Sequence, residues 1–361
     1  MVDEDKLAGV RQRIDALDEQ IQELISRRAE AAQEVARVKL KEDPDAHFYR
    51  PEREAEVLSQ VMERNRGPLS DEVMARLFRE IMSACLALEQ PLSIGFLGPE
   101  GTFTQAAALK HFGHAVETVS LGSIPDVFRE VESGGCHYGV VPVENSTEGV
   151  ISHTLDMFMS SPLSICGEVT LRINHNLLGI GGGLGAIDKV YSHQQSLAQC
   201  RGWLDTNLAH AERIAVGSNA EAARLAREDP RAAAIASETA GEIYGLRILA
   251  EKIEDEPCNT TRFLIIGRQD VPPSGNDKTS LLLATRNEAG GLHRLLTPFA
   301  VHGISMSRIE SRPSRQGVWD YVFFVDIEGH QQDEELAAVL RELSQESRMC
   351  KVLGSYPKSV L

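Results

Sequence analysis

A threonine and an arginine stand side by side where a polar stretch meets a short apolar run, in Asn259-Thr260-Thr261-Arg262-Phe263. The run continues to Gly267, a pattern typical of a buried strand whose polar start lies at the edge of a sheet. The Thr261 hydroxyl can donate a proton, and the Arg262 guanidinium can bind a carboxylate through two parallel hydrogen bonds. The pair suits an anionic substrate that loses a hydroxyl group, although Thr-Thr-Arg is also common on ordinary strand surfaces.

Polar residues also follow other strand-like runs. The run 138–143 leads into Glu144-Asn145-Ser146, and Val190-Tyr191 leads into Ser192-His193. Glu144 and His193 are candidates for a general base, but a strand-end Glu often caps a helix and a Ser-His pair often bonds the backbone.

A glycine-bearing turn, Gly98-Pro99-Glu100-Gly101-Thr102-Phe103, follows the strand-like run 93–97 and precedes a helix. Such a turn offers backbone amides to an anion. Its glycine spacing matches neither phosphate-binding loop, which argues against a nucleotide.

A second set of charged residues lies in the first 90 residues. Between Val10 and Asp43 there is no Gly or Pro, and apolar residues recur at heptad spacing, which predicts one long helix that packs in a dimer. Arg28 interrupts the apolar row, and Lys39 follows it on the same face about three turns later. Because an unpaired buried guanidinium is costly, an anion should meet Arg28, either a ligand or a glutamate from a neighbouring helix.

Two more helices should follow. One begins at Pro51 and ends before Gly67-Pro68, and the next runs from the Ser70 cap to the residue before Pro91. The last of them puts Cys85 and Glu89 one turn apart on a largely apolar face. A solvated Glu89 at the helix end is the alternative.

This helical segment resembles the all-helical chorismate mutases, which are intertwined dimers that share one arginine across subunits. The resemblance implies that Arg28 and the partner's Arg11 hold two substrate carboxylates. Lys39 and Glu89 would then bracket the ether oxygen. Glu54 would contact the ring hydroxyl. The residues that carry this mapping are Arg11, Arg28, Lys39, Arg53, Glu54, Cys85 and Glu89. A pericyclic rearrangement needs no acid, base or nucleophile, so such a site acts by fixing a conformer and stabilising charge on the breaking C–O bond.

Strand and helix signals alternate from 92 to 270, which predicts two α/β lobes with largely parallel sheets. The motifs at 98–103, 144–146 and 260–263 resemble, in that order, those of prephenate dehydratase, whose two lobes are similar to those of periplasmic binding proteins. The resemblance implies that Thr261 is the acid for the departing hydroxyl and that Arg262 helps to hold a carboxylate, with no metal or other cofactor. The other implied cleft residues are Thr102, Glu144, Asn145, Ser146, Ser192, Gln199, Thr260 and Phe263.

The stretch 268–276 has the composition of a linker. After it, strand and helix signals at 279–285, 291–301, 304–311, 318–327, 333–346 and 350–355 predict the βαββαβ plait of ferredoxin-like folds. Gly290-Gly291-Leu292 and Glu310-Ser311-Arg312-Pro313 resemble the phenylalanine-binding motifs of the regulatory ACT domain.

Composition limits the remaining possibilities. A net charge of −16 disfavours a nucleic-acid partner, and no apolar run is long enough for a membrane helix. The sequence begins without the basic and apolar regions of a signal peptide, so a cytoplasmic protein is expected. The six cysteines are scattered, which predicts reduced thiols without disulfides or zinc.

We therefore expect a multidomain chain with a helical domain at 1–90, a two-lobed α/β domain at 92–270 and an α+β plait at 278–361. The resemblances imply a homodimeric enzyme that converts chorismate to prephenate and then to phenylpyruvate, with feedback inhibition by phenylalanine. Three alternatives remain open: preference for arogenate, a dehydratase whose helices only dimerise, and a non-catalytic amino-acid sensor.

Overall fold

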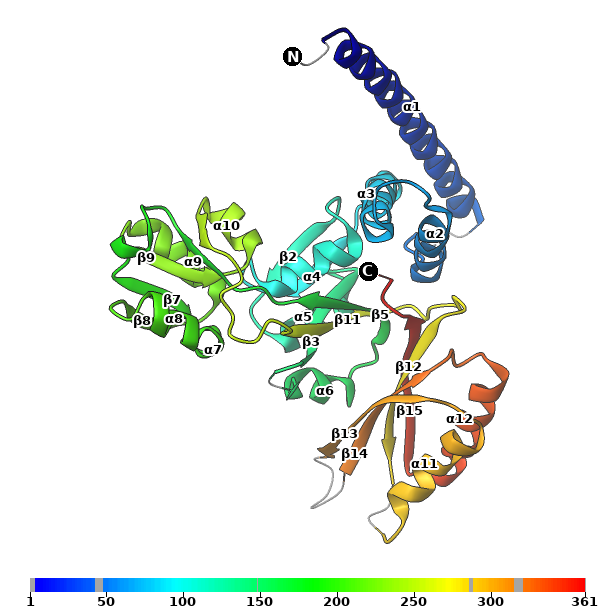
Figure 1. Cartoon of the computed structure of the whole chain (residues 1–361). Helices are drawn as coiled ribbons and strands as arrows, with labels where there is room; N and C mark the ends of the chain where they lie inside the picture. Colours follow the sequence, from blue (N-terminus) through cyan, green and yellow to red (C-terminus); the bar gives the residue numbers. More distant parts are fainter. Residues whose placement is uncertain (1–3, 43–47, 148, 286–287, 315–320, 361) are drawn as a thin grey trace.

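The computed structural model describes residues 4–42, 48–147, 149–285, 288–314 and 321–360 (Figure 1). Along the chain it has a helical unit, two α/β lobes and an antiparallel plait, so the expected multidomain fold class is confirmed. Residues 1–3 of the expected first domain and 318–320 of an expected strand lie outside the described residues. Within the described ranges, no helix combines the length and the apolar character needed to cross a membrane.

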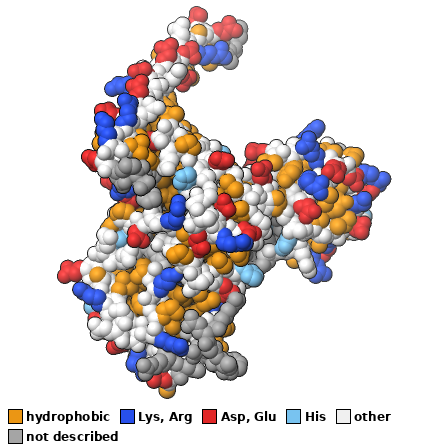
Figure 2. Space-filling model, turned by 180° about the vertical axis from the view of Figure 1, so that it is seen from behind, with side chains coloured by type: hydrophobic (Ala, Val, Ile, Leu, Met, Phe, Trp, Pro, Cys, Tyr) orange, Lys and Arg blue, Asp and Glu red, His pale blue; other side chains and the backbone are white. Residues whose placement is uncertain are grey.

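The helical unit has three helices, α1 (Glu4–Glu42), α2 (Pro51–Arg64) and α3 (Asp71–Glu89). Helix α2 starts at the expected proline, and the Ser70 hydroxyl caps α3 by accepting a hydrogen bond from the Val73 amide at 3.4 Å. Helix α1 contacts α3 near one end and projects away from the body of the molecule (Figures 1 and 2). Its apolar row is solvent-exposed in the single chain, as Leu17 at 55% and Leu24 at 61% show.

The first lobe is built on a mixed sheet in the order β2-β1-β3-β11-β5, with the short β4 paired to β3. Strand β1 pairs in parallel with β2 and β3, whereas β11 is antiparallel to both β3 and β5. The expectation of largely parallel sheets is therefore wrong, because β11 returns from the second lobe and not through a local strand–helix–strand crossover. The elements of this lobe are β1 (Ser93–Leu97), α4 (Phe103–Phe112), β2 (Glu117–Leu121), α5 (Ile124–Ser133), β3 (Tyr138–Asn145), β4 (Gly149–Val150), α6 (Ser152–Phe158), β5 (Ser164–Arg172) and β11 (Thr260–Gly267).

The second lobe is inserted between β5 and β11, so two chain segments join the lobes. Its sheet has the order β10-β6-β9-β7-β8, with β7 parallel to β8 and β9. The elements are β6 (Asn176–Gly179), the 3-10 helix η1 (Leu184–Ala186), β7 (Lys189–His193), α7 (Gln194–Gln199), α8 (Arg201–Asn207), β8 (Glu212–Val216), α9 (Asn219–Glu228), β9 (Ala232–Ala236), α10 (Glu238–Tyr244) and β10 (Arg247–Ala250).

The plait has the expected βαββαβ order and an antiparallel sheet in the order β13-β14-β12-β15. Its two helices cover one face, and the other face packs on the first lobe in a shared hydrophobic core. Strand β15 passes so close to β5 that a β-carbon on Gly354 would collide with the Ile165 carbonyl oxygen. The elements are β12 (Asp277–Ala284), α11 (Gly291–Val301), β13 (Met306–Pro313), β14 (Tyr321–Glu328), α12 (Glu334–Glu346) and β15 (Met349–Pro357).

Strand β11 divides its side chains between two cores. Phe263 and Ile265 pack with α4 and with Tyr49 of the segment before α2. Leu264 and Ile266 point the other way and pack with α5, α6 and the plait sheet. The sheet of the first lobe therefore joins the helical unit on one face and the plait on the other.

Candidate functional sites

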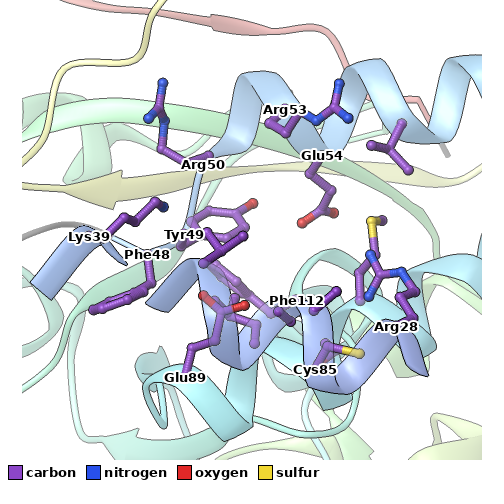
Figure 3. A pocket seen from close by; sticks show the side chains of 17 residues that line it. Arg28, Lys39, Phe48, Tyr49, Arg50, Arg53, Glu54, Cys85, Glu89 and Phe112 are labelled. Carbon is purple, nitrogen blue, oxygen red and sulfur yellow. The ribbon is translucent and has the colours of Figure 1, made fainter. Parts of the chain in front are cut away.

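A cavity of about 380 Å³, here called the helix pocket, lies between the three N-terminal helices and the end of α4 (Figure 3). Six of the seven residues predicted for the helical site line it: Arg28, Lys39, Arg53, Glu54, Cys85 and Glu89. The seventh, Arg11, precedes Arg28 by 17 residues and so lies about 25 Å away along α1. A single chain does not test its predicted role in a partner's pocket.

The charged groups of the helix pocket face one another across the cavity. Figure 3 shows the Glu54 and Glu89 carboxyls reaching in from α2 and α3, with Arg28 and Lys39 at its two ends. Burial raises the pKa of Glu89, and the charges of Lys39 and Arg28 only partly oppose this. Glu89 therefore holds its proton to a higher pH than an exposed glutamate does.

Sequence reasoning missed the aromatic wall of this pocket. Phe48 and Tyr49 precede α2, and Phe112 comes from the last turn of α4 in the first lobe. The Tyr49 and Phe112 rings lie 5.2 Å apart, and the Tyr49 hydroxyl is 2.9 Å from His111 Nε2. No local pattern marks Phe112 as a neighbour of these helices.

Arg53 lines the helix pocket but already has a carboxylate partner. Its Nη1 lies 2.5 Å from Glu56 Oε2, one turn along the exposed face of α2.

A second cavity of about 430 Å³, here called the lobe pocket, opens between the two lobes. Five predicted residues line it: Thr102, Asn145, Gln199, Thr261 and Phe263. His193, which was considered as a general base, also lines it. Polar lining residues that were missed include His175, Ser196, Asn219 and Asn259. Asn259 directly precedes the predicted motif, whereas the others carry no signal beyond a polar residue near a strand end.

The antiparallel direction of β11 brings its start to the carboxyl end of β3, so Thr261 pairs with Asn145. The Asn145 Nδ2 donates to Thr261 Oγ1 and to Asn259 Oδ1, both at 2.8 Å. Asn259 in turn donates to Gln199 Oε1 at 3.1 Å, and that oxygen is 2.8 Å from His175 Nε2. Thr261 is thus a buried hydroxyl held by a chain of polar groups that crosses from one lobe to the other.

Two ten-residue helices begin at the lobe pocket. Gly101 to Thr104 form the start of α4, and Ser218 and Asn219 form the start of α9. Helix N-termini carry unpaired amides and positive partial charge. The lobe pocket therefore offers anion-binding ends from both lobes.

Arg262 does not face the lobe pocket, which corrects its prediction as a carboxylate contact. Alternation along β11 turns it to the opposite face from Thr261, toward the plait. Its Nε is 2.7 Å from Glu168 Oε2, its Nη1 is 2.5 Å from Asp326 Oδ2, and its Nη2 donates to the Tyr356 hydroxyl at 3.0 Å. Burial alone would raise the pKa of Asp326, but Arg262 and a hydrogen bond from Ser280 hold it below its usual range.

Four other predicted cleft residues also lie outside the lining of the lobe pocket. Glu144 pairs with Arg308 of the plait at 3.1 Å. Ser146 and Thr260 bond each other at the strand ends, with the Thr260 amide donating to Ser146 Oγ at 2.9 Å. Ser192 is fully buried, and its hydroxyl donates to Asn219 Oδ1 at 2.9 Å, so it supports a lining residue from behind.

The predicted effector motifs occupy two elements of the plait. Gly290 adopts a left-handed φ of 76° just before α11, which Gly291 begins and Leu292 continues. Glu310 to Pro313 end the edge strand β13, and Arg312 from this motif pairs with Asp156 of α6 at 2.9 Å. The second motif is therefore in direct contact with the first lobe.

Comparison with known proteins agrees with this architecture. Family models match at three places: chorismate mutase type II at residues 10–90, prephenate dehydratase at 94–271 and ACT domain at 279–345. The bifunctional chorismate mutase/prephenate dehydratase of Stutzerimonas stutzeri is 58% identical over 365 residues, with 100% of both chains covered. That of Escherichia coli K12 is 34% identical, covering 99% of this chain and 97% of the relative. The chain belongs to the bifunctional chorismate mutase/prephenate dehydratase family.

Solved structures match about three quarters of the chain. Prephenate dehydratase from Arthrobacter aurescens in complex with L-Phe is 34% identical with a TM-score of 0.68, covering 74% of this chain and 90% of that one. A structure described as GqqA, a novel type of quorum quenching acylase, is 32% identical with a TM-score of 0.69, covering 74% and 98%. Because one fold carries two named activities, the full-length relatives decide the family here.

The mutase activity should depend on pH through Glu89. A carboxylic acid there can donate a hydrogen bond to developing charge, whereas a carboxylate would repel it. Because the pKa of Glu89 is raised, we expect mutase kcat/KM to fall as pH rises through that pKa. The Glu89→Gln variant should have a flatter profile and exceed the parent at alkaline pH. If mutase kcat/KM of the parent does not vary with pH, or if the parent and Glu89→Gln show the same pH dependence, Glu89 does not contact the ether oxygen.

The dehydratase activity should depend on the Thr261 hydroxyl. Thr261→Val keeps the shape of the side chain, so we expect dehydratase kcat to fall by roughly 10²- to 10⁴-fold while mutase activity persists. Thr260→Val is the matched control, because Thr260 is the neighbouring threonine and does not line the lobe pocket. Equal effects of the two substitutions on dehydratase kcat would contradict a specific role for Thr261.

Proposed function

We propose that the helix pocket is where chorismate becomes prephenate and that the lobe pocket is where prephenate becomes phenylpyruvate. The conversion in two steps agrees with membership of the bifunctional family. The observation that carries the assignment is that residues from three helices line one cavity with two cations, Arg28 and Lys39, and two carboxyls, Glu54 and Glu89.

In the helix pocket, Arg28 holds one substrate carboxylate and Lys39 donates to the ether oxygen. Glu89, in its acid form, donates to the same oxygen from α3, and Glu54 accepts from the ring hydroxyl. These contacts fix the reactive conformer and stabilise negative charge on the oxygen as the C–O bond breaks.

In the lobe pocket, Thr261 donates the proton that lets the ring hydroxyl leave as water while CO₂ is lost. Asn145 donates to Thr261 Oγ1, which leaves the threonine proton available for the substrate. Arg262 is paired with Asp326 of the plait and does not reach the substrate. The substrate carboxylates are therefore held by the N-termini of α4 and α9, which line the lobe pocket.

A second copy of the chain completes the helix pocket. The apolar row of α1 is exposed in the single chain, and its heptad spacing suits a helix from an identical partner. In such a homodimer the partner's Arg11 supplies the contact to the second carboxylate of chorismate.

Phenylalanine is the effector, and it binds at Gly290 to Leu292 and Glu310 to Pro313. The solved relative with bound L-Phe supports this ligand. The contact between Arg312 and Asp156 offers a route by which occupancy of the ACT domain alters the first lobe.

Mixing two inactive variants tests the shared site. Arg11→Ala and Arg28→Ala should each lower mutase kcat/KM by at least ~100-fold, because each removes an anchor for a carboxylate. In a hybrid dimer one pocket keeps both arginines and the other keeps neither. Random exchange should therefore restore about a quarter of the parental sites. A mixture no more active than its components would show that Arg11 does not act across subunits.

A coupled assay with chorismate as substrate and phenylpyruvate as product tests the overall function. We expect the parent to be inhibited by phenylalanine and Ser311→Val to need at least ~10-fold more phenylalanine, because binding is weakened. Asp156→Asn should bind phenylalanine normally, measured by calorimetry, yet be inhibited less. Absence of phenylpyruvate would favour the sensor alternative, and unchanged inhibition of Ser311→Val would place the effector elsewhere.

A further inference from the structure

A buried arginine that was not predicted for either site links the two enzymes. Arg79 lies on α3 and is 8% exposed. Its Nε donates to Glu54 Oε1 at 3.0 Å, and its Nη1 donates to the Lys110 carbonyl oxygen at 2.9 Å. The first contact is with a wall residue of the helix pocket, and the second is with the dehydratase domain.

The Lys110 carbonyl oxygen, which binds Arg79 on the dehydratase side, is a favourable partner for a cation. Lys110 belongs to the last turn of α4, where carbonyl groups lack partners within the helix and carry negative partial charge. Arg79 is therefore held between a helix C-terminus and a carboxylate, and both of its partners are fixed in packed elements.

Glu54 needs such a partner to act as an acceptor. Burial raises the pKa of Glu54, and the charge and hydrogen bond of Arg79 offset this only in part. The ion pair with Arg79 is the contact that favours the carboxylate form of Glu54. A protonated Glu54 would donate from one oxygen and could rotate away from Arg79. With Oε1 bound to Arg79, the carboxylate is fixed and Oε2 remains to accept from a substrate.

The other titratable groups near Glu54 do not replace Arg79. Burial lowers the pKa of His111 to about 3, so its ring is neutral near pH 7. Burial also raises the pKa of the Tyr49 hydroxyl well above its usual value, so it is neutral as well. Glu54 borders the helix pocket and a second, smaller cavity beside it. The other charged residues that line the helix pocket are Arg28, Lys39, Arg50, Arg53 and Glu89. Those that line the smaller cavity, apart from Arg79, are Glu168 and Lys358.

We propose that Arg79 is a positioning residue of the mutase, which fixes the Glu54 carboxylate toward chorismate from an anchor on the dehydratase domain. This role rests on the proposed contact between Glu54 and the ring hydroxyl. It makes the mutase pocket dependent on a neighbouring domain, whose Phe112 also forms part of its wall.

The experiment compares Arg79→Met with the parent in the full chain, by mutase kinetics across pH. We expect kcat/KM near pH 7 to fall ~10- to 100-fold, because a misplaced contact weakens the reactive geometry. Without Arg79, Glu54 ionises at a higher pH, so the acid limb of the mutase profile should move toward higher pH. Arg76→Met removes the same charge from an exposed position on α3 and is the matched control. Dehydratase turnover of added prephenate reports whether the chain is folded.

A second background separates positioning from folding. Glu54→Gln should itself impair the mutase, and adding Arg79→Met to it should cost less than about threefold more, since the two residues act as a pair. The double variant also leaves no unpaired buried charge, so it should fold even if Arg79→Met does not.

Three results would overturn the proposal, and they are distinguishable. If Arg79→Met has the same mutase kcat/KM as the parent at every pH, Arg79 does not position Glu54. An equal loss in both backgrounds would show that Arg79 acts through the fold and not through Glu54. Parental activity of Glu54→Gln would overturn the assignment of Glu54 to the chorismate site, and the role of Arg79 with it.

Discussion

Strand β11 is buried on both faces in the middle of a sheet, so adjacent residues on it must serve different neighbours. Thr261 faces the lobe pocket and is held by Asn145. Arg262 faces the plait and is held by Glu168 and Asp326. A shift of the ACT sheet that moves Arg262 must therefore act on the backbone that carries Thr261. This covalent adjacency directly connects the ACT domain with the lobe pocket.

Helix α4 makes a comparable connection between the helix pocket and the lobe pocket. Its first residues, Thr102 to Thr104, border the lobe pocket, and Phe112 at its other end borders the helix pocket. A ten-residue helix is about 15 Å long and rigid along its axis. The two pockets therefore share a structural element, although they are proposed to hold different substrates.

Periodicity was sufficient to predict the three helices and the plait, and the resemblance to chorismate mutases supplied most of the charged residues of the helix pocket. Heptad spacing fixes one face of a long helix, so Arg28 and Lys39 had to point the same way. The same reasoning failed for Arg262, because a strand that is apolar on both faces carries no signal about which face meets the ligand. It also could not find Phe112 or Arg79, whose neighbours come from another domain, nor the antiparallel direction of β11.

The partners of Arg262 are synthesised at different times, which affects folding of the nascent chain. Tyr356, which accepts from Arg262, follows it by 94 residues. A ribosome must therefore complete both inner strands and the last strand of the ACT sheet before this buried guanidinium has all its partners. Until then Arg262 of a nascent chain has Glu168 of the first lobe as a partner but lacks Asp326 and Tyr356, so a chain that ended after the lobes would keep only part of the network next to Thr261.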